Sequence, residues 1–155
     1  MQNRSELEKF VEEAPGNYVD QIERTSPLSL LLLLNHALTK PQEQDAKSSL
    51  QINQIIEPPK NIRELWRQVP PDIPSIAGYL QPIKKWLFES GKPGDFILVQ
   101  GDFGATYIMV SHAFEHGLIP VYTTTFREAE ERNKEDGMVE MTHRFRHQRF
   151  RKYGV

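Results

Sequence analysis

Hydrophobic residues fall into short runs and stripes that alternate between the spacing of strands and the spacing of helices. A nearly continuous apolar run, Leu28 to Leu34, predicts a strand buried on both faces. Pro41 to Leu50 predicts a helix with proline in its first turn, and Ile52 to Ile56 predicts a second short strand. Two further helices are expected, from Asn61 to Val69 and from Ile73 to Glu89.

The second half of the chain continues this alternation. Asp95 to Gln100 predicts a strand, and the helix that follows it is expected to end near His116, before Gly117. The remaining predicted elements are a strand from Leu118 to Tyr122, a loop at Thr123-Thr124-Thr125, a short helix from Arg127 to Asn133, a turn at Asp136-Gly137 and an extended segment from Met138 to Tyr153, interpreted as a hairpin.

Strands that alternate with helices favour right-handed crossovers and a mostly parallel sheet covered on both sides. We therefore expect an α/β fold, a Rossmann-like three-layer domain with a mostly parallel sheet and a C-terminal β-hairpin. A length of 155 residues suits a single domain. We place this domain at residues 27–155 and interpret residues 1–26 as an N-terminal extension.

Composition narrows the class of protein. A hydrophobic content of 38% with 26% charged residues is typical of a globular chain. No apolar run approaches the roughly 20 residues of a membrane-spanning helix, and the chain has no cysteine for disulfides or thiolate sites. We therefore expect a cytoplasmic protein that does not associate with membranes.

Charge is unevenly distributed along the chain. The net charge is −2, so any anionic ligand must be attracted by a local basic patch. The C-terminal segment from Met141 onward contains no acidic residue, which indicates either an anion-binding surface or a solvated face. Its basic residues are Arg144, Arg146, Arg149, Arg151 and Lys152.

Three predicted loops leave strands at the carboxyl edge of the sheet, where open α/β folds bind ligands. They are Asn35 to Thr39, Gln100 to Thr106 and Thr123 to Arg127. In the second loop, Gly101 and Gly104 suit a tight turn before a helix whose free N–H groups attract an anion. The same glycines also suit a turn that binds nothing.

Three side chains near this edge have competing interpretations. Asp102 is either the cap of the following helix or a group that recognises a ribose hydroxyl or a base amino group. His36 either contacts phosphate and donates a proton, or is a solvent-exposed loop residue. His112 begins an H-x-x-E-H pattern found in some zinc peptidases, but it lies about 12 Å along the helix from the ligand edge. We therefore expect neither a metal site nor a cofactor.

Four segments together resemble a known family. They occur in the order Asn35-His36-Ala37-Leu38-Thr39, Gln100-Gly101-Asp102-Phe103-Gly104-Ala105-Thr106, Thr123-Thr124-Thr125-Phe126-Arg127-Glu128-Ala129 and Arg149-Phe150-Arg151-Lys152-Tyr153. This combination resembles the small stand-alone CRISPR-associated proteins of type III systems, in the group related to CARF domains and ring nucleases. The resemblance covers roughly residues 28–153.

The resemblance implies a homodimer that binds cyclic oligoadenylate, with cyclic tetra-adenylate as the expected ring, and cleaves it. In such enzymes a ribose 2′-hydroxyl attacks the adjacent phosphodiester without a metal, which switches off type III CRISPR antiviral signalling. The implied catalytic residues are His36, Asn35 and Arg149, with His36 as the general acid. The implied ligand-binding residues are Gln100, Gly101, Asp102, Phe103, Gly104, Thr106, Thr124, Arg127 and Arg151.

The sequence leaves two other functions open. A non-catalytic sensor or sponge for cyclic oligoadenylate would need fewer of these residues than an enzyme. The C-terminal segment, in which Phe145, Phe150 and Tyr153 interleave with arginines, also suits an RNA-binding accessory protein. We expect no stable binding to DNA.

Overall fold

A computed structural model describes residues 27–133 and 135–155 of the chain, and the predicted extension at residues 1–26 lies outside the described residues. A mixed five-stranded sheet with the order β2-β1-β3-β4-β5 forms the middle of the fold. The first four strands in chain order are parallel, and the last runs antiparallel beside β4. The strands are β1 (Ser29–Leu33), β2 (Gln54–Ile56), β3 (Phe96–Val99), β4 (Ile119–Asn133) and β5 (Val139–Lys152).

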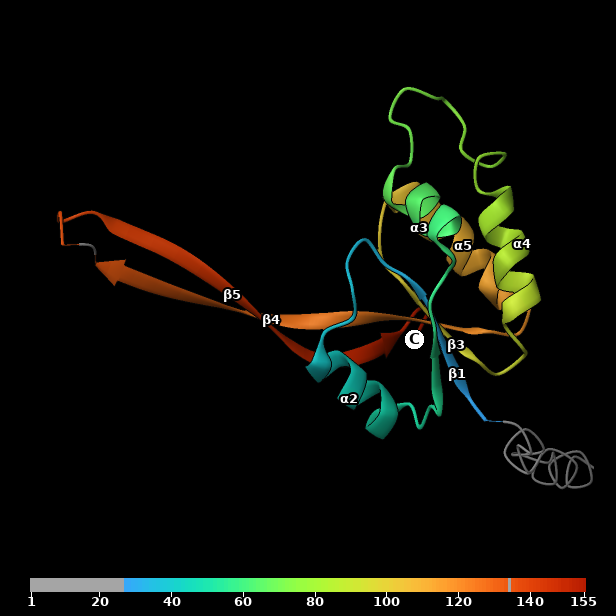
Figure 1. Ribbon diagram of the computed structural model, residues 1–155, viewed down its shortest axis with the longest axis horizontal. Helices are drawn as coiled ribbons and strands as arrows, with labels where there is room; N and C mark the ends of the chain where they lie inside the picture. Colours follow the sequence, from blue (N-terminus) through green and yellow to red (C-terminus); the bar gives the residue numbers. More distant parts are fainter. Residues whose placement is uncertain (1–26, 134) are drawn as a thin grey trace, which may run out of the picture.

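Helices cover both faces of this sheet (Figure 1). α2 (Lys40–Ser49) lies on one face, while α3 (Lys60–Arg67), α4 (Gln81–Ser90) and α5 (Phe103–Glu115) lie on the other. The α/β class and the mostly parallel sheet predicted from the sequence are therefore confirmed. None of the helices formed by the described residues is long and apolar enough to cross a membrane.

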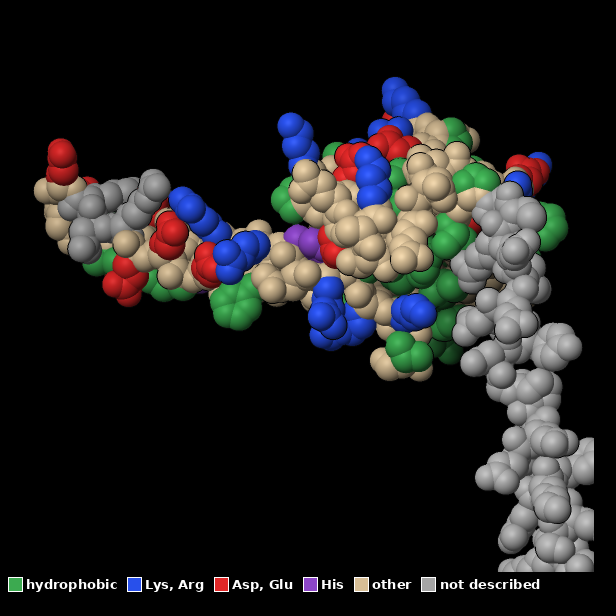
Figure 2. Space-filling model, turned by 90° about the horizontal axis from the view of Figure 1, so that it is seen from below, with side chains coloured by type: hydrophobic (Ala, Val, Ile, Leu, Met, Phe, Trp, Pro, Cys, Tyr) green, Lys and Arg blue, Asp and Glu red, His purple; other side chains and the backbone are tan. Residues whose placement is uncertain are grey.

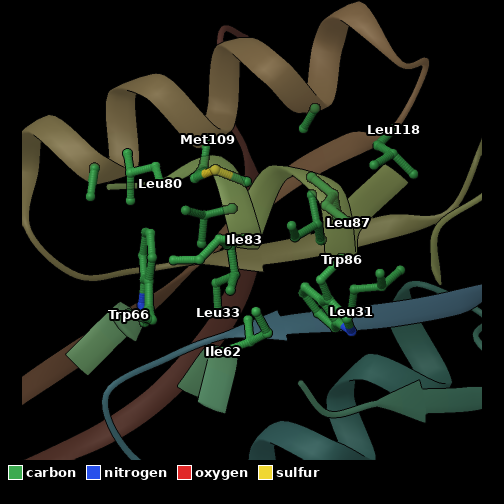
Figure 3. Packing of buried hydrophobic residues seen from close by; sticks show 14 residues of the cluster. Leu31, Leu33, Ile62, Trp66, Leu80, Ile83, Trp86, Leu87, Met109 and Leu118 are labelled. Carbon is green, nitrogen blue, oxygen red and sulfur yellow. The ribbon is translucent and has the colours of Figure 1, made fainter. Parts of the chain in front are cut away.

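The uninterrupted leucine run contributes side chains to both hydrophobic cores. Every residue of β1 is buried, as predicted, because its side chains alternate between the two faces of the sheet. Leu31 and Leu33 belong to the cluster under α3, α4 and α5, whereas Leu30 and Leu32 belong to the cluster under α2. Figure 3 shows the first cluster, in which Trp66 and Met109 pack with leucines and isoleucines from the sheet and helices.

Polar groups hold the amino end of β1 in place. The backbone N–H of Ser29 donates to Asp95 Oδ1 at 3.0 Å, and the N–H of Lys92 donates to Asp95 Oδ2 at 2.9 Å. Asn53 donates its N–H to the Leu28 carbonyl at 2.8 Å and accepts the Leu28 N–H on its side-chain oxygen at 3.2 Å. These bonds fix where β1 starts relative to its neighbours.

The helix predicted from Ile73 is wrong in its first half. Residues 73–80 form turns and irregular chain, and the helix begins only at Gln81. Pro70, Pro71 and Pro74 precede it closely, and proline disfavours helical backbone in the residue before it. The spacing of apolar residues still marked buried positions correctly, since Leu80 and Ile83 are both fully buried.

The loop at Thr123-Thr124-Thr125 and the helix from Arg127 to Asn133 are also wrong, because all of these residues belong to β4. The strand is stabilised by its partner, since Glu128 pairs with Arg146 at 2.9 Å and Glu130 pairs with Arg144 at 3.4 Å. Cross-strand pairing has overridden the helical propensity of a segment rich in glutamate.

β4 and β5 continue far beyond the rest of the sheet. β3 pairs with β4 only as far as Val121, after which β4 and β5 extend together as a two-stranded ribbon (Figure 1). The last side-chain contact between β5 and the helices joins His147 Nε2 to Asp45 Oδ2 of α2 at 2.7 Å. We call residues 126–146 the arm. The predicted turn at Asp136-Gly137 forms its tip and is confirmed, but the hairpin joins β4 to β5 rather than folding residues 138–153 on themselves.

Candidate functional site

The carboxyl edge of the sheet contains a point where strand order reverses. From β1 the chain continues to β2 on one side, and from β3 it continues to β4 on the other. The crevice at the carboxyl ends of two such strands is where open α/β sheets bind ligands. Asn35 and His36 follow β1, and Gln100 to Asp102 follow β3, so these two predicted loops do meet at one edge.

Gln100 connects the elements around this crevice. Its backbone N–H donates to the Leu33 carbonyl at 3.0 Å, and its carbonyl accepts the indole N–H of Trp66 at 3.1 Å. Its side-chain oxygen accepts the backbone N–H of Thr123 at 3.2 Å and the hydroxyl of Thr123 at 2.7 Å. Gln100 therefore lies at the predicted edge, but its side-chain oxygen serves to hold β4 beside β3.

Gly101 is placed by packing against the core. A Cβ at this position would lie 2.9 Å from two atoms of the Trp66 ring, which is closer than real side chains approach. Gly104 differs, because its nearest neighbours to an added Cβ are at 3.4 Å. Neither glycine has a positive φ. The turn therefore needs Gly101 for the close approach of Trp66.

Asp102 caps α5, as one of its two interpretations predicts. Its Oδ1 accepts the backbone N–H of Ala105 at 2.9 Å, while the residue itself stays exposed. Directly after it, Phe103 is 95% exposed, and Tyr107, one helical turn further along, is 76% exposed. The hydroxyl oxygen of Thr106 is buried and has no hydrogen-bond partner among the described residues.

His36 lies at a small cavity of about 50 Å³ between the ends of β1 and β2. Its Nδ1 is 2.9 Å from the carbonyl of Ala37. Since a carbonyl only accepts, Nδ1 carries the hydrogen and Nε2 is left to take or give a proton. The side chain is exposed, so a ligand at this edge has access to Nε2.

Two arginines of α3 line the same cavity, and we did not predict them. Arg63 donates to the Pro58 carbonyl at 3.4 Å and lies 3.8 Å from Glu57, while its buried Nε has no hydrogen-bond partner in the described part of the chain. Arg67 makes no ion pair with the side chains that the structure describes. The recognisable signal was two arginines four residues apart on a helix that follows a strand, which places both on one face.

The base of the β4–β5 ribbon adds two further cations. Thr124 faces Arg149 across the ribbon and donates its hydroxyl to the Arg149 carbonyl at 3.3 Å. Arg151 faces Tyr122, lies 5.7 Å over its ring and donates to its hydroxyl at 3.3 Å. Thr124 thus lies on β4 and Arg149 and Arg151 on β5, two and three strands from β1 in the sheet, and none of the three lines the cavity at His36.

The fold carries Arg127, another predicted ligand-binding residue, away from the edge of the sheet. Arg127 lies on the arm, where its Nε is 3.2 Å from His143 Nδ1 and its guanidinium lies 6.0 Å over the Phe145 ring. The cause is the incorrect loop prediction, since a loop after Tyr122 would have kept Arg127 at the sheet edge, whereas the strand carries it outward.

A separate cluster lies at the opposite end of α5 from Asp102. His112, Glu115 and His116 each bring one potential ligand atom to within 4.8 Å of the others, and His116 Nδ1 lies 2.8 Å from the His112 carbonyl. Burial lowers the pKa of His112 below its ordinary value of 6.5, and the neighbouring charge of His116 lowers it further. The absence of a metal site stays a prediction.

This lowered pKa predicts a loss of stability in acid. Between the two pKa values the unfolded chain binds more protons than the folded one, so His112 contributes fully above about pH 6.5 and its contribution is lost as the pH falls. Urea unfolding at about pH 7.5 and about pH 5 should show a smaller decrease in free energy for His112→Gln than for the wild type. A parallel decrease for the variant and the wild type would contradict the prediction.

Sequence comparison adds the family to this geometry. Residues 28–151 match the family described as the "Uncharacterized protein MJ1673 family". The chain belongs to the MJ1673 family. A relative named "Uncharacterized protein MJ1673", from Methanocaldococcus jannaschii, is 47% identical over 124 residues, which cover 80% of this chain and 95% of that protein. No solved structure matches the chain. The range that matches the MJ1673 family includes the candidate edge and the whole arm.

Proposed function

We propose that the protein is a cytoplasmic ring nuclease that binds cyclic oligoadenylate and cleaves it, and so ends type III CRISPR signalling. The observation that carries this proposal is the position of His36 beside Arg63 and Arg67 at the carboxyl edge of the sheet. A hydrogen bond orients the imidazole, and two guanidinium groups lie where a phosphate would be attracted. The four segments that resemble CARF-related proteins support this proposal. We propose further that the fold is Rossmann-like, since helices cover both faces of its mostly parallel sheet.

The cavity itself limits how the ligand would bind. At about 50 Å³ it is far smaller than the several hundred Å³ that enclose a whole nucleotide. A phosphate group therefore enters the cavity mouth while sugars and bases stay outside. The exposed rings of Phe103 and Tyr107 offer surfaces on which adenine bases stack, an interaction of about 1–3 kcal/mol per base.

The proposed reaction needs only the groups of the ring and of this chain. A ribose 2′-oxygen forms a bond to the adjacent phosphorus, the bond from phosphorus to the 5′-oxygen breaks, and a 2′,3′-cyclic phosphate results. His36 Nε2, when protonated, donates its proton to the departing 5′-oxygen, and solvent takes the proton of the 2′-hydroxyl. Arg63 and Arg67 in the cavity wall, with Asn35 next to His36 in the chain, stabilise the negative charge on the phosphorane-like transition state. Arg149 lies on β5, three strands from β1 in the sheet, and would contact another phosphate of the ring.

The symmetry of the ligand favours two copies of the chain. A ring of identical nucleotides has rotational symmetry, and a two-fold dimer offers matching halves to it. We therefore propose that the working form is a homodimer with the carboxyl edges of both sheets directed toward the ligand.

The direct test is incubation of the purified protein with cyclic tetra-adenylate in EDTA, with products separated by chromatography. We expect linear oligoadenylates that end in a 2′,3′-cyclic phosphate. An intact ring after long incubation with excess protein would overturn the catalytic proposal. Thermal stabilisation by the ring without any cleavage would identify a sensor or sponge instead, and RNA binding without any response to the ring would identify an accessory protein.

A further inference from the structure

The arm exposes large apolar side chains that no other described residue covers. Phe145 is 67% exposed, Val139 57% and Met141 52%. Figure 2 shows hydrophobic side chains along the lower side of the arm, well away from the body of the molecule. Isolated two-stranded ribbons are marginally stable in water, because one face has no core to pack against. A partner is therefore expected on this face.

The two faces of the arm differ in character. One face carries Glu128 and Glu130, which pair with Arg146 and Arg144, together with the exposed ring of Phe126 at the base of the arm. The register places three rungs on the other face: Arg127 opposite Phe145, Ala129 opposite His143, and Glu131 opposite Met141. We call this second face, which includes Val139, the apolar face.

We propose that the apolar face of the arm packs against the same face of a second copy, with a two-fold axis across the strands at the Ala129–His143 rung. This axis places β4 of one copy over β4 of the other, with the two strands running in opposite directions. A residue that lies a given number of positions before Ala129 then faces the partner's residue that lies the same number after it, so Arg127 meets the partner's Glu131. Phe145 meets the partner's Met141, and the small Ala129 lies at the centre.

Charge complementarity selects this arrangement over an unrelated partner. Among the side chains that the structure describes, Glu131 makes no ion pair, and neither does Arg127, whose guanidinium group lies near His143 and over the Phe145 ring. The proposed axis supplies each of them with an opposite charge and does so twice, as a self-complementary interface requires. It also covers Phe145 and Met141 with each other, which removes apolar surface from water.

The same axis limits how far the two arms overlap. Beyond the rungs from Arg127 to Glu131, the next position on this face is the partner's His147, which Asp45 of its own α2 already covers. The overlap is therefore roughly 16 Å long at about 3.3 Å per residue. This inference gives an interface to the homodimer of the proposed function but rests on the arm alone, since it requires neither ligand nor cleavage.

Sedimentation velocity of the full chain over about 1–100 µM tests the interface. We expect a dimer for the wild type and a monomer for Met141→Asp, which places a charge on the apolar face. Thr142→Asp adds the same charge at the next residue, on the opposite face, and should remain a dimer. Circular dichroism of both variants reports whether the body still folds.

Charge exchange gives a sharper test. Arg127→Glu and Glu131→Arg should each raise the dimer dissociation constant by about tenfold or more, because each places like charges together twice. The double variant should restore it toward the wild-type value. A monomeric wild type, or single variants that dimerise as well as the wild type, would overturn the inference. A dimer that fails to cleave the ring would remove only the proposed function. A cleaving monomer would remove this interface and the proposed homodimer but leave the proposed cleavage standing.

Discussion

Replacing His36 with alanine is expected to slow cleavage of cyclic tetra-adenylate by about one hundred- to ten thousand-fold, the range of general acid catalysis. The reason is geometric, because the bond from Nδ1 to the Ala37 carbonyl holds the ring so that Nε2 is the proton carrier. The ring nucleotide should still bind, since Arg63 and Arg67 remain in the cavity wall. Single-turnover assays with saturating protein separate these two effects.

A second histidine variant provides the control for this experiment. His116 lies at the far end of α5, and His116→Ala should cleave at the wild-type rate. If His36→Ala loses binding and cleavage to the same extent, His36 holds the ring rather than protonating it. Unchanged cleavage by His36→Ala would remove it from the mechanism altogether.

Replacing Gly101 with alanine is expected to lower the free energy of unfolding by about 1–3 kcal/mol, the usual cost of overpacking a core. The added Cβ would lie 2.9 Å from the Trp66 ring, and that ring is buried and tied to the Gln100 carbonyl. The indole therefore cannot withdraw without losing its hydrogen bond. Urea unfolding monitored by circular dichroism measures the change.

Gly104→Ala is the matched control for this prediction. Its Cβ would have ordinary contacts at 3.4 Å, and alanine favours a helix over glycine by about 0.5–1 kcal/mol. We therefore expect a protein at least as stable as the wild type. If Gly101→Ala were equally stable, the close packing of Trp66 would not explain the glycine.

The sequence predicted those elements whose signals are local. The leucine run marked β1, proline in the first turn marked α2, and Gly117, with a φ of 70°, marked the end of α5. Glycine is favoured at position 117 because the positive φ there would be strained for a residue with a side chain. Each of these signals acts within a few residues, so pattern and turn chemistry were enough.

The errors arose where distant residues decide the structure. Residues 127–133 have the composition of an exposed helix, but Glu128 and Glu130 alternate so as to meet Arg146 and Arg144 of β5. The alternation of these glutamates indicates a strand only when their pairing with the arginines of β5 is known. The same dependence on distant residues applies to the site. Asn35 and His36 directly follow a predicted strand, so their place at the sheet edge could be predicted. The arginines of α3 line the cavity only because the crossover after β2 brings α3 beside the end of β1.

The leucines of β1 cannot set their own alignment. Residues 30–34 are all leucine, so a shift of the strand by one or two positions would present the same side chains to both cores. The bonds of Ser29 and Leu28 to Asp95, Asn53 and Gln54 therefore supply a landmark that the leucines lack, at the end of the strand away from the site. A shift of two residues would carry His36 about 7 Å from its cavity. The polar side chains of Asp95 and Asn53 thus help to fix the register of β1, and this register determines where His36 lies at the opposite end of the strand.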